Sequence, residues 1–285
     1  MEMNYNDVEK VLGRKQHKEL LNIENVDNLV GKKILITGAN GSIGTVLCKR
    51  LDQLGISYLA TDIEGNLEYL DITDFHQVFS IVNKYQPDFI VNIAGAKHAP
   101  DGEHETWKTL SINTIGTKNL IDCAPMECSI ILTSTCKSCN PEIVYGSSKL
   151  IAERMIMNSG GSVARFFNVV ESSGNVFEIW DQVPESLPIK VAPTCERHFI
   201  SVGEATGLIL YAMNENKNKR YIVNSGHLRL MKDVAEDLYP QREKIIIEPR
   251  RGDRLTERFM STSESIKKYH LNNSIIELKS IHDKI

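Results

Sequence analysis

The stretch that decides the fold is Lys33-Ile34-Leu35-Ile36-Thr37 followed by Gly38-Ala39-Asn40-Gly41-Ser42-Ile43-Gly44. The first run is short, apolar and rich in isoleucine, which is typical of a buried strand. The glycines after it permit a tight turn, and residues 43–54 have the periodicity of a helix. This order of elements is typical of a dinucleotide-binding site, because the helix N-terminus attracts a pyrophosphate. The alternative is a structural strand–turn–helix that holds no ligand.

From residue 32 onward, apolar runs and helical stretches alternate. The runs that indicate strands are 33–37, 57–61, 88–93, 129–134 and 163–167. Such alternation predicts a parallel sheet that helices cover on both faces. We therefore predict an α/β protein, with a Rossmann-type doubly wound parallel sheet and a smaller C-terminal substrate-binding lobe.

The same pattern divides the chain. Residues 1–30 are expected to be an N-terminal helical lead-in, and 31–171 an NAD(P)-binding Rossmann domain that carries the catalytic residues. Residues 172–285 are expected to be mainly the substrate-binding lobe, with 196–225 returning to the Rossmann sheet. Open α/β sheets bind ligands at the carboxyl ends of their strands, so the lobe should lie there.

Composition excludes several classes of partner. The net charge of −4 gives no reason to expect nucleic acid or an anionic membrane. No apolar stretch reaches the roughly 18 residues of a membrane span, and the polar start does not resemble a signal peptide. The six cysteines are therefore expected to be reduced thiols in a cytoplasmic protein.

Tyr145 and Lys149 are four residues apart and share one face of an expected helix. A tyrosine does acid–base work near neutral pH only if its pKa of about 10 is lowered. A nearby ammonium and a cationic nicotinamide favour the phenolate. Together with the Gly-rich turn, the pair predicts a tyrosine-dependent dehydrogenase or reductase of the short-chain type. The pair alone is commonplace on helix surfaces.

Asp62 is the basis for the choice of cofactor. It lies 18 residues after Gly44, at the end of the second strand run. An acid there accepts hydrogen bonds from the ribose of NAD and repels the 2′-phosphate of NADP. No arginine follows in residues 63–66, so NAD is favoured over NADP. The alternative is a solvated loop acid. Asp71 is expected either to cap the next turn or to touch the adenine.

Residues 134–149 read Ser-Thr-Cys-Lys-Ser-Cys-Asn-Pro-Glu-Ile-Val-Tyr-Gly-Ser-Ser-Lys. This stretch resembles the UDP-N-acetylglucosamine 4,6-dehydratases of polysaccharide biosynthesis, members of the extended short-chain dehydrogenase/reductase family. That family has Ser-Thr-Asp-Lys, then Asn-Pro, then Tyr-Gly-x-x-Lys. The matching residues here are Ser134, Thr135, Lys137, Asn140, Pro141, Tyr145, Gly146 and Lys149.

Further segments resemble the same family, and the resemblance covers about residues 10–260. They are Leu12-Gly13-Arg14-Lys15, Ala96-Lys97-His98-Ala99-Pro100, Asn113-Thr114-Ile115-Gly116-Thr117, Arg165-Phe166-Phe167-Asn168-Val169 and Arg250-Arg251-Gly252-Asp253-Arg254-Leu255-Thr256-Glu257.

From the turn, the spacing and the resemblance we predict three groups of site residues, with no metal. The catalytic residues are Thr135, Cys136, Lys137, Tyr145 and Lys149. The cofactor residues are Gly38, Asn40, Gly41, Ser42, Ile43, Gly44, Asp62, Asp71, Ile72, Ala94, Gly95, Ala96, Asn113, Tyr145 and Lys149. The substrate residues are Lys97, His98, Asn168, Arg250 and Glu257, and Arg197-His198 is a second basic candidate for the pyrophosphate.

The resemblance implies an internal redox cycle on UDP-N-acetylglucosamine. Tyr145 takes the proton of the 4-hydroxyl while hydride moves from carbon 4 to the nicotinamide. Thr135 holds the same oxygen, and Lys149 holds the ribose and the phenolate. Lys137 then removes the proton of carbon 5, water leaves carbon 6, and hydride returns to carbon 6. Tyr145 stands where membrane-bound relatives often have Met, which implies inversion at carbon 5.

Two residues depart from the family pattern. Cys136 stands where the family has the Asp that protonates the departing hydroxyl, and Arg251 stands where it has Pro. A free thiol has a pKa of about 8.5 and can donate a proton at neutral pH. Cys136 is therefore the expected acid, and the alternatives are a water, Glu171, His98, or an inert packing thiol. Cys136-x-x-Cys139 lacks the companions of a zinc site, and a redox-sensing disulfide is a further alternative.

Two rival functions stay open. A UDP-sugar 4-epimerase would use Tyr145, Lys149 and the cofactor, but it needs no base at carbon 5. A cofactor-sensing Rossmann protein would need no Tyr–Lys pair. The resemblance also implies a homo-oligomer, a dimer or higher, formed by the helices near 105–121 and 145–158.

Overall fold

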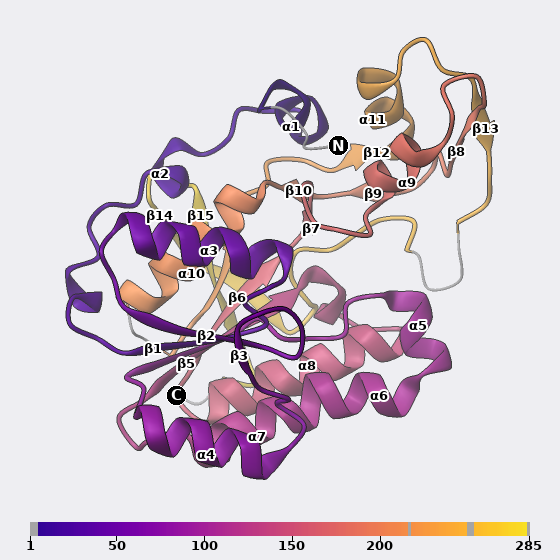
Figure 1. Cartoon of the computed structure of the whole chain (residues 1–285). Helices are drawn as coiled ribbons and strands as arrows, with labels where there is room; N and C mark the ends of the chain where they lie inside the picture. Colours follow the sequence, from indigo (N-terminus) through magenta and orange to yellow (C-terminus); the bar gives the residue numbers. More distant parts are fainter. Residues whose placement is uncertain (1–4, 216–217, 250–253, 284–285) are drawn as a thin grey trace.

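The computed structural model describes residues 5–215, 218–249 and 254–283, and its centre is a nine-stranded sheet (Figure 1). The strand order is β14-β15-β11-β6-β5-β4-β1-β2-β3, and every pair from β11 to β3 is parallel. The parallel strands are β1 (Ile34–Thr37), β2 (Tyr58–Asp62), β3 (Glu68–Tyr69), β4 (Phe89–Asn92), β5 (Ser129–Thr135), β6 (Ser162–Phe166) and β11 (Arg220–Val223).

Helices cover both faces of the sheet, as the alternation predicted. Along β1, Ile34 and Ile36 join one apolar cluster and Leu35 joins another, because successive side chains point to opposite faces. The first cluster includes residues of α3 (Ser42–Gln53) and α10 (Val202–Glu215). The second includes residues of α4 (Phe75–Tyr85), α7 (Gly116–Cys123) and α8 (Val144–Asn158). The structure confirms the α/β class and the mainly parallel, doubly wound sheet.

A smaller lobe, at the top of Figure 1, has its own apolar cluster. Its elements are α9 (Val176–Gln182), β8 (Ile189–Val191), β9 (Glu196–Arg197), β12 (Arg229–Leu230), α11 (Met231–Leu238) and β13 (Lys244–Ile246). Helix α1 (Tyr5–Leu12) packs against α11, and Val8, Val11 and Leu12 are buried in the lobe's cluster. Residues 5–12 are therefore part of the lobe and not only a lead-in, because their apolar face needs α11 to be buried.

The C-terminal residues correct the sequence interpretation, which placed 226–285 in the lobe. Strands β14 (Glu264–His270) and β15 (Ile275–Ser280) form an antiparallel hairpin, and β15 pairs with β11 at the edge of the central sheet. The strand pattern was hidden because β14 is an edge strand with mostly exposed polar residues, Glu-Ser-Ile-Lys-Lys-Tyr-His. Such residues are typical of protected sheet edges.

Short elements complete the described chain. They are α2 (Lys18–Leu21), η1 (Asp27–Leu29), α5 (Ala99–His104), α6 (Thr106–Leu110), the π-helical turn η2 (Ser111–Ile115), η3 (Cys136–Ser138), β7 (Asn168–Val169) and β10 (Phe199–Ile200). Strand β10 pairs with β7 outside the central sheet. Within the described ranges, no helix has both the length and the apolar character needed to cross a bilayer.

Candidate active site

A cavity of about 1580 Å³ lies between the carboxyl ends of the parallel strands and the lobe. Its walls come from the Gly-rich turn after β1, the ends of β2 and β5, the loop after β4, helix α8 and the lobe. The sequence-predicted residues that line it are Gly38, Gly41, Ser42, Ile43, Asp62, Asp71, Ile72, Ala94, Gly95, Ala96, Lys97, His98, Thr135, Lys137, Tyr145, Lys149, Asn168 and Arg197.

The Gly-rich turn has the close backbone packing that a dinucleotide site needs. Gly38 has a φ of +71°, and a Cβ built on it would lie 2.5 Å from the backbone nitrogen of Ala94. A Cβ on Gly44 would lie 2.5 Å from the carbonyl oxygen of Gly38. Asn40 and Gly44 thus shape the turn without lining the cavity, whereas Gly41 and Ser42 begin α3 at the cavity wall. These residues fit a pyrophosphate against the helix N-terminus.

Two acids line the end of the cavity where the adenosine half of a dinucleotide would lie. Asp62 Oδ2 accepts a hydrogen bond of 2.9 Å from the backbone nitrogen of Asn40, so the acid braces the turn. Asp71 Oδ1 accepts hydrogen bonds of 2.8 Å from both the backbone nitrogen and the hydroxyl of Thr73. Asp71 therefore caps the local turn, which is the first of the two predicted alternatives, and it also lines the cavity.

Asn113 supports the cavity from behind. Its side chain is buried in the π-helical turn, where it accepts from the backbone nitrogen of Ala96 and donates to the Ala96 carbonyl, both at 3.0 Å. It also donates to Ser148 Oγ on α8 at 3.0 Å. Asn113 is not among the described residues that line the cavity. Its amide instead fixes the loop after β4 against α8, and π-helical turns are frequent at functional sites.

Tyr145 and Lys149 both face the cavity from α8. Lys149 Nζ donates to the carbonyl oxygen of Thr133 at 3.2 Å, and burial lowers its pKa to about 8. Burial also raises the pKa of the Tyr145 hydroxyl, while the charge of Lys137 and a hydrogen bond with Thr135 act in the opposite direction. Without a bound ligand, Tyr145 is therefore a neutral phenol at neutral pH.

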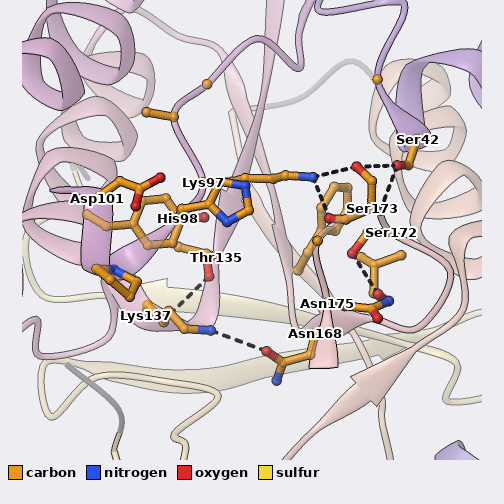
Figure 2. A pocket seen from close by; sticks show the side chains of 18 of the residues that line it. Ser42, Lys97, His98, Asp101, Thr135, Lys137, Asn168, Ser172, Ser173 and Asn175 are labelled. Carbon is orange, nitrogen blue, oxygen red and sulfur yellow. Dashed lines mark hydrogen bonds between the residues drawn. The ribbon is translucent and has the colours of Figure 1, made fainter. Parts of the chain in front are cut away.

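Lys137 is held by two acceptors at the cavity wall. Its Nζ donates to Asn168 Oδ1 at 3.3 Å and to Glu257 Oε1 at 3.4 Å (Figure 2 shows the Asn168 contact). Burial by itself lowers the pKa of Lys137, but the Glu257 carboxylate raises it above its ordinary value. A lysine acts as a base at neutral pH only if its pKa is lowered, and in the ligand-free protein the charge of Glu257, a residue distant in sequence, outweighs burial and raises the pKa of Lys137.

Glu257 was predicted to contact substrate, and it is not among the described cavity-lining residues. Its side chain is only 3% exposed. Oε2 accepts hydrogen bonds from Asn168 Nδ2 at 2.7 Å and from the backbone nitrogen of His198 at 3.2 Å. Oε1 also lies 3.6 Å from Arg197 Nε. Glu257 thus holds the cavity residues Lys137 and Asn168 by contacts outside the cavity. Asn113 holds Ala96 in the same way.

The structure does not bring two of the proposed acids to the cavity. Cys136 is 1% exposed and packs in the apolar cluster that includes residues of α3 and α10. Burial raises the pKa of its thiol to about 12. Glu171 accepts from the backbone nitrogen of Val202, at the start of α10, at 2.8 Å. Neither residue is among the described lining residues. Cys139 accepts a hydrogen bond from Arg165 at 3.2 Å and is buried.

The predicted substrate residues lie in different settings. His98 is exposed at the cavity and lies against Gly174, where an added Cβ would be 2.8 Å from His98 Cε1. Lys97 Nζ donates to the carbonyl and hydroxyl oxygens of Ser173 at 2.8 and 3.0 Å. Ser173 in turn donates its backbone N–H to Ser42 Oγ at 3.0 Å, so three segments meet there (Figure 2). Arg250 lies outside the described residues.

Sequence reasoning missed the part of the lobe that closes the cavity. Ser173 has no distinctive motif, and Phe177 and Trp180 carry only an ordinary helical pattern. It also missed a buried ion network under α8, in which Glu153 pairs with Arg165 at 2.6 Å. The sequence contained one indication of this network. Glu153 follows Lys149 by four residues, so it lies on the same side of α8 and could have been predicted to be buried.

The fold and the site define an extended short-chain dehydrogenase/reductase, with a Gly-rich dinucleotide turn and a Tyr–Lys pair on one cavity. The family model described as polysaccharide biosynthesis protein matches residues 34–279, so the chain belongs to that family.

The chain is also similar to individual proteins and to solved structures. It is 30% identical over 263 residues to the probable polysaccharide biosynthesis protein EpsC of Bacillus subtilis, covering 81% of this chain and 44% of EpsC. It is 27% identical over 276 residues to a UDP-N-acetylglucosamine 4,6-dehydratase (inverting) of Campylobacter jejuni, covering 85% of this chain and 81% of that protein. The X-ray structure of Pen from Bacillus thuringiensis superposes with a TM-score of 0.75 at 22% identity, covering 88% of each chain. The chain spans about half the length of the first curated relatives it matches.

Proposed function

We propose that this protein is a nucleotide-sugar 4,6-dehydratase that acts on UDP-N-acetylglucosamine and inverts carbon 5. The observation that carries the proposal is that Thr135, Lys137 and Tyr145 line the same cavity as the Gly-rich turn. An enzyme that oxidises carbon 4 and eliminates at carbons 5 and 6 needs all of these groups at one sugar ring. The family and the name of the Campylobacter jejuni relative support the same reaction class.

The chain's own residues divide the work. Tyr145 accepts the proton of the 4-hydroxyl, Thr135 holds that oxygen, and Lys149 orients the cofactor ribose and lowers the cost of forming the phenolate. A bound nicotinamide supplies a reversible acceptor for the hydride. Lys137 acts at carbon 5, whose proton the 4-ketone makes acidic. The lobe closes the cavity over the sugar and excludes water from the reactive intermediate.

The test is mass spectrometry of UDP-N-acetylglucosamine after incubation with the protein, without added reductant. We expect a product lighter by one water, and deuterated solvent should label carbon 5. Unchanged substrate, with or without added NAD and NADP, contradicts the proposal.

A UDP-sugar 4-epimerase is the second candidate, and one observation favours it. The Cys136 thiol packs in the apolar cluster, so the residue that replaces the family's acid is not among the described residues that line the cavity. The same incubation separates the two functions, because an epimerase yields an isomer of unchanged mass.

A further inference from the structure

Glu257 is a buried carboxylate in contact with a lysine of the proposed active site. Lys137 has 26% of its side chain exposed and reaches the cavity, whereas Glu257 has 3% exposed and lies behind it. Their Nζ and Oε1 atoms are 3.4 Å apart. Asn168 contacts both residues, since its Oδ1 accepts from Lys137 and its Nδ2 donates to Glu257. The three side chains therefore form one unit, in which Lys137 and Asn168 line the cavity and Glu257 lies behind them.

The other charged or titratable groups around this unit are few among the described residues. Tyr145 approaches Lys137 from α8, and Cys136 approaches it from the same turn. Arg197 lies beside Glu257 Oε1 at 3.6 Å and lines the cavity, and the titratable side chain of His198 also interacts with the Glu257 carboxylate. Both the Lys137 contact and the Arg197 contact favour the charged form of the Glu257 carboxylate, and its pKa is lowered despite burial. In the resting state the proton therefore resides on Lys137.

This inference rests on the proposed dehydration, which moves one proton within the sugar. The reaction takes a proton from carbon 5 and removes the carbon-6 hydroxyl as water. It needs a group that accepts the first proton and a group that donates to the departing oxygen. Lys137 is the cavity residue placed for carbon 5, but its ammonium cannot accept a proton until it has given one away. Glu257 is in hydrogen-bond contact with it to receive that proton.

We propose that Lys137 and Glu257 form a proton relay that carries the carbon-5 proton to the departing carbon-6 oxygen. Lys137 is the catalytic residue that touches the sugar, and Glu257 is the positioning residue behind it. Asn168 holds the two side chains in position through one hydrogen bond to each.

The relay balances in protons and electrons. In the first step an N–H bond of Lys137 breaks and its proton forms an O–H bond with Glu257. The freed amine takes the carbon-5 proton, and the C–H electron pair enters the enolate of the 4-ketone. In the second step the enolate electrons form the double bond between carbons 5 and 6, and the carbon-6 oxygen leaves with its bonding pair and a proton from Lys137. Glu257 then returns its proton to Lys137, which restores the starting state.

The relay also explains how the site works with Cys136 in the apolar cluster. No third proton donor is required, because the proton that leaves with water is the one taken from carbon 5.

Glu257→Gln is the decisive variant, because the amide preserves a hydrogen-bond acceptor for Asn168 but cannot take a proton. We expect elimination, measured as water loss by mass spectrometry, to slow by about 10²–10⁴-fold. Oxidation at carbon 4, measured as reduced-nicotinamide absorbance in a single turnover, should change by less than about threefold, since Glu257 has no part in that step. Reduced cofactor should therefore accumulate in the variant.

The pH dependence separates a relay from a merely structural role. Glu257 raises the pKa of Lys137, so its removal leaves burial to lower that pKa. The neutral amine then forms without Glu257, so the residual elimination of Glu257→Gln should rise with pH more steeply than the elimination of the unmodified protein. Equal slowing of oxidation and elimination, or the same pH dependence of elimination in both proteins, overturns the relay.

Two further variants keep the test decisive. Glu171→Gln is the control, because Glu171 is a half-buried carboxylate that binds a backbone nitrogen of α10 and does not contact Lys137, and we expect no change in either step. If Glu257→Gln fails to fold, Glu257→Asp retains the charge with a longer gap to Nζ. It should slow elimination selectively, and an unchanged elimination rate overturns the relay. An unmodified protein that removes no water refutes instead the proposed function.

Discussion

Tyr145 is the residue on which the proposed chemistry at carbon 4 depends. Its hydroxyl is near Thr135 and Lys137, and burial keeps it neutral in the ligand-free protein. Tyr145→Phe should reduce turnover by about 10²–10⁴-fold, because only the proton acceptor is lost. Cofactor affinity, measured by fluorescence titration, should stay within about threefold. Tyr269→Phe, on the exposed edge strand β14, is the control. Normal turnover by Tyr145→Phe would contradict the assignment of Tyr145 as the proton acceptor.

Asp62 allows a prediction about cofactor choice. Its carboxylate braces the Gly-rich turn and lines the cavity beside Glu64, so two acids surround the expected ribose site. Negative charge there repels the 2′-phosphate of NADP. Cofactor-free protein should therefore bind NAD at least about tenfold more tightly than NADP in calorimetric titration. Tighter binding of NADP would contradict this charge argument.

Lys149 is expected to lower the free energy of unfolding, because its ammonium is buried at the proposed active site. Its buried ammonium has a pKa lowered to about 8, whereas an unfolded lysine titrates near 10.4. The unfolded state binds more protons between these values, so stability rises with pH through that window. Lys149→Met should be inactive, yet its ligand-free form should be more stable at pH 7 by roughly 1–3 kcal/mol. Chemical denaturation at pH 7 and near pH 10 checks this, because the extra stability of Lys149→Met over the unmodified protein should be smaller near pH 10.

At the scale of elements, a buried ion network joins α8 to the edge of the sheet. Arg165 on β6 contacts Glu153 of α8 at 2.6 Å and Glu264 of β14 at 2.8 Å, and all three side chains are less than 5% exposed. Arg220 on β11 approaches the same two carboxylates at 3.3 and 3.4 Å. The network thus fixes the C-terminal hairpin relative to the helix that carries Tyr145 and Lys149.

Arg165→Met should be strongly destabilising, because it leaves two carboxylates buried beside one remaining arginine. Breaking a buried ion pair by removing one partner costs about 3–5 kcal/mol. Urea unfolding measures the loss. Lys118→Met is the control, since its pair with Asp122 is exposed on α7 and should contribute less than about 0.5 kcal/mol. A loss of similar size in both variants would show that the network does not hold these elements together.

At the scale of the whole molecule, the helices of the predicted dimer interface expose large apolar side chains. Trp107 on α6 is 73% exposed, Ile115 in η2 is 42% exposed, and Ile151 on α8 is 44% exposed. These helices lie side by side in the structure (Figure 1). Apolar side chains gathered on neighbouring helices are typical of an interface.

We therefore expect a dimer in sedimentation at micromolar concentration, and Trp107→Asp should weaken it at least about tenfold by burying a charge. Met126→Asp is the matched control, because Met126 is 98% exposed in the loop after α7. A monomer for the unmodified protein, or equal weakening by both variants, would contradict the predicted interface.

The sequence by itself determined the features that depend on local patterns. The strand, turn and helix at 33–54 follow from residue periodicity and from Gly38 and Gly44, whose positions leave no room for a Cβ. The i, i+4 spacing of Tyr145 and Lys149 places both at the cavity for the same reason, since helix geometry fixes which side chains share a face. The parallel sheet follows from the alternation of such segments.

Only the tertiary structure decided which groups surround each functional side chain. Lys137 and Glu257 are 120 residues apart in sequence, and their contact raises the pKa of Lys137 although burial by itself lowers it. Cys136 follows Thr135 directly, yet it packs in the apolar cluster and is not among the described residues that line the cavity. The hairpin β14–β15 joins the sheet through an edge strand that local hydrophobicity does not mark. Burial and charge act through space, so a pKa or a cavity wall depends on contacts that no local pattern encodes.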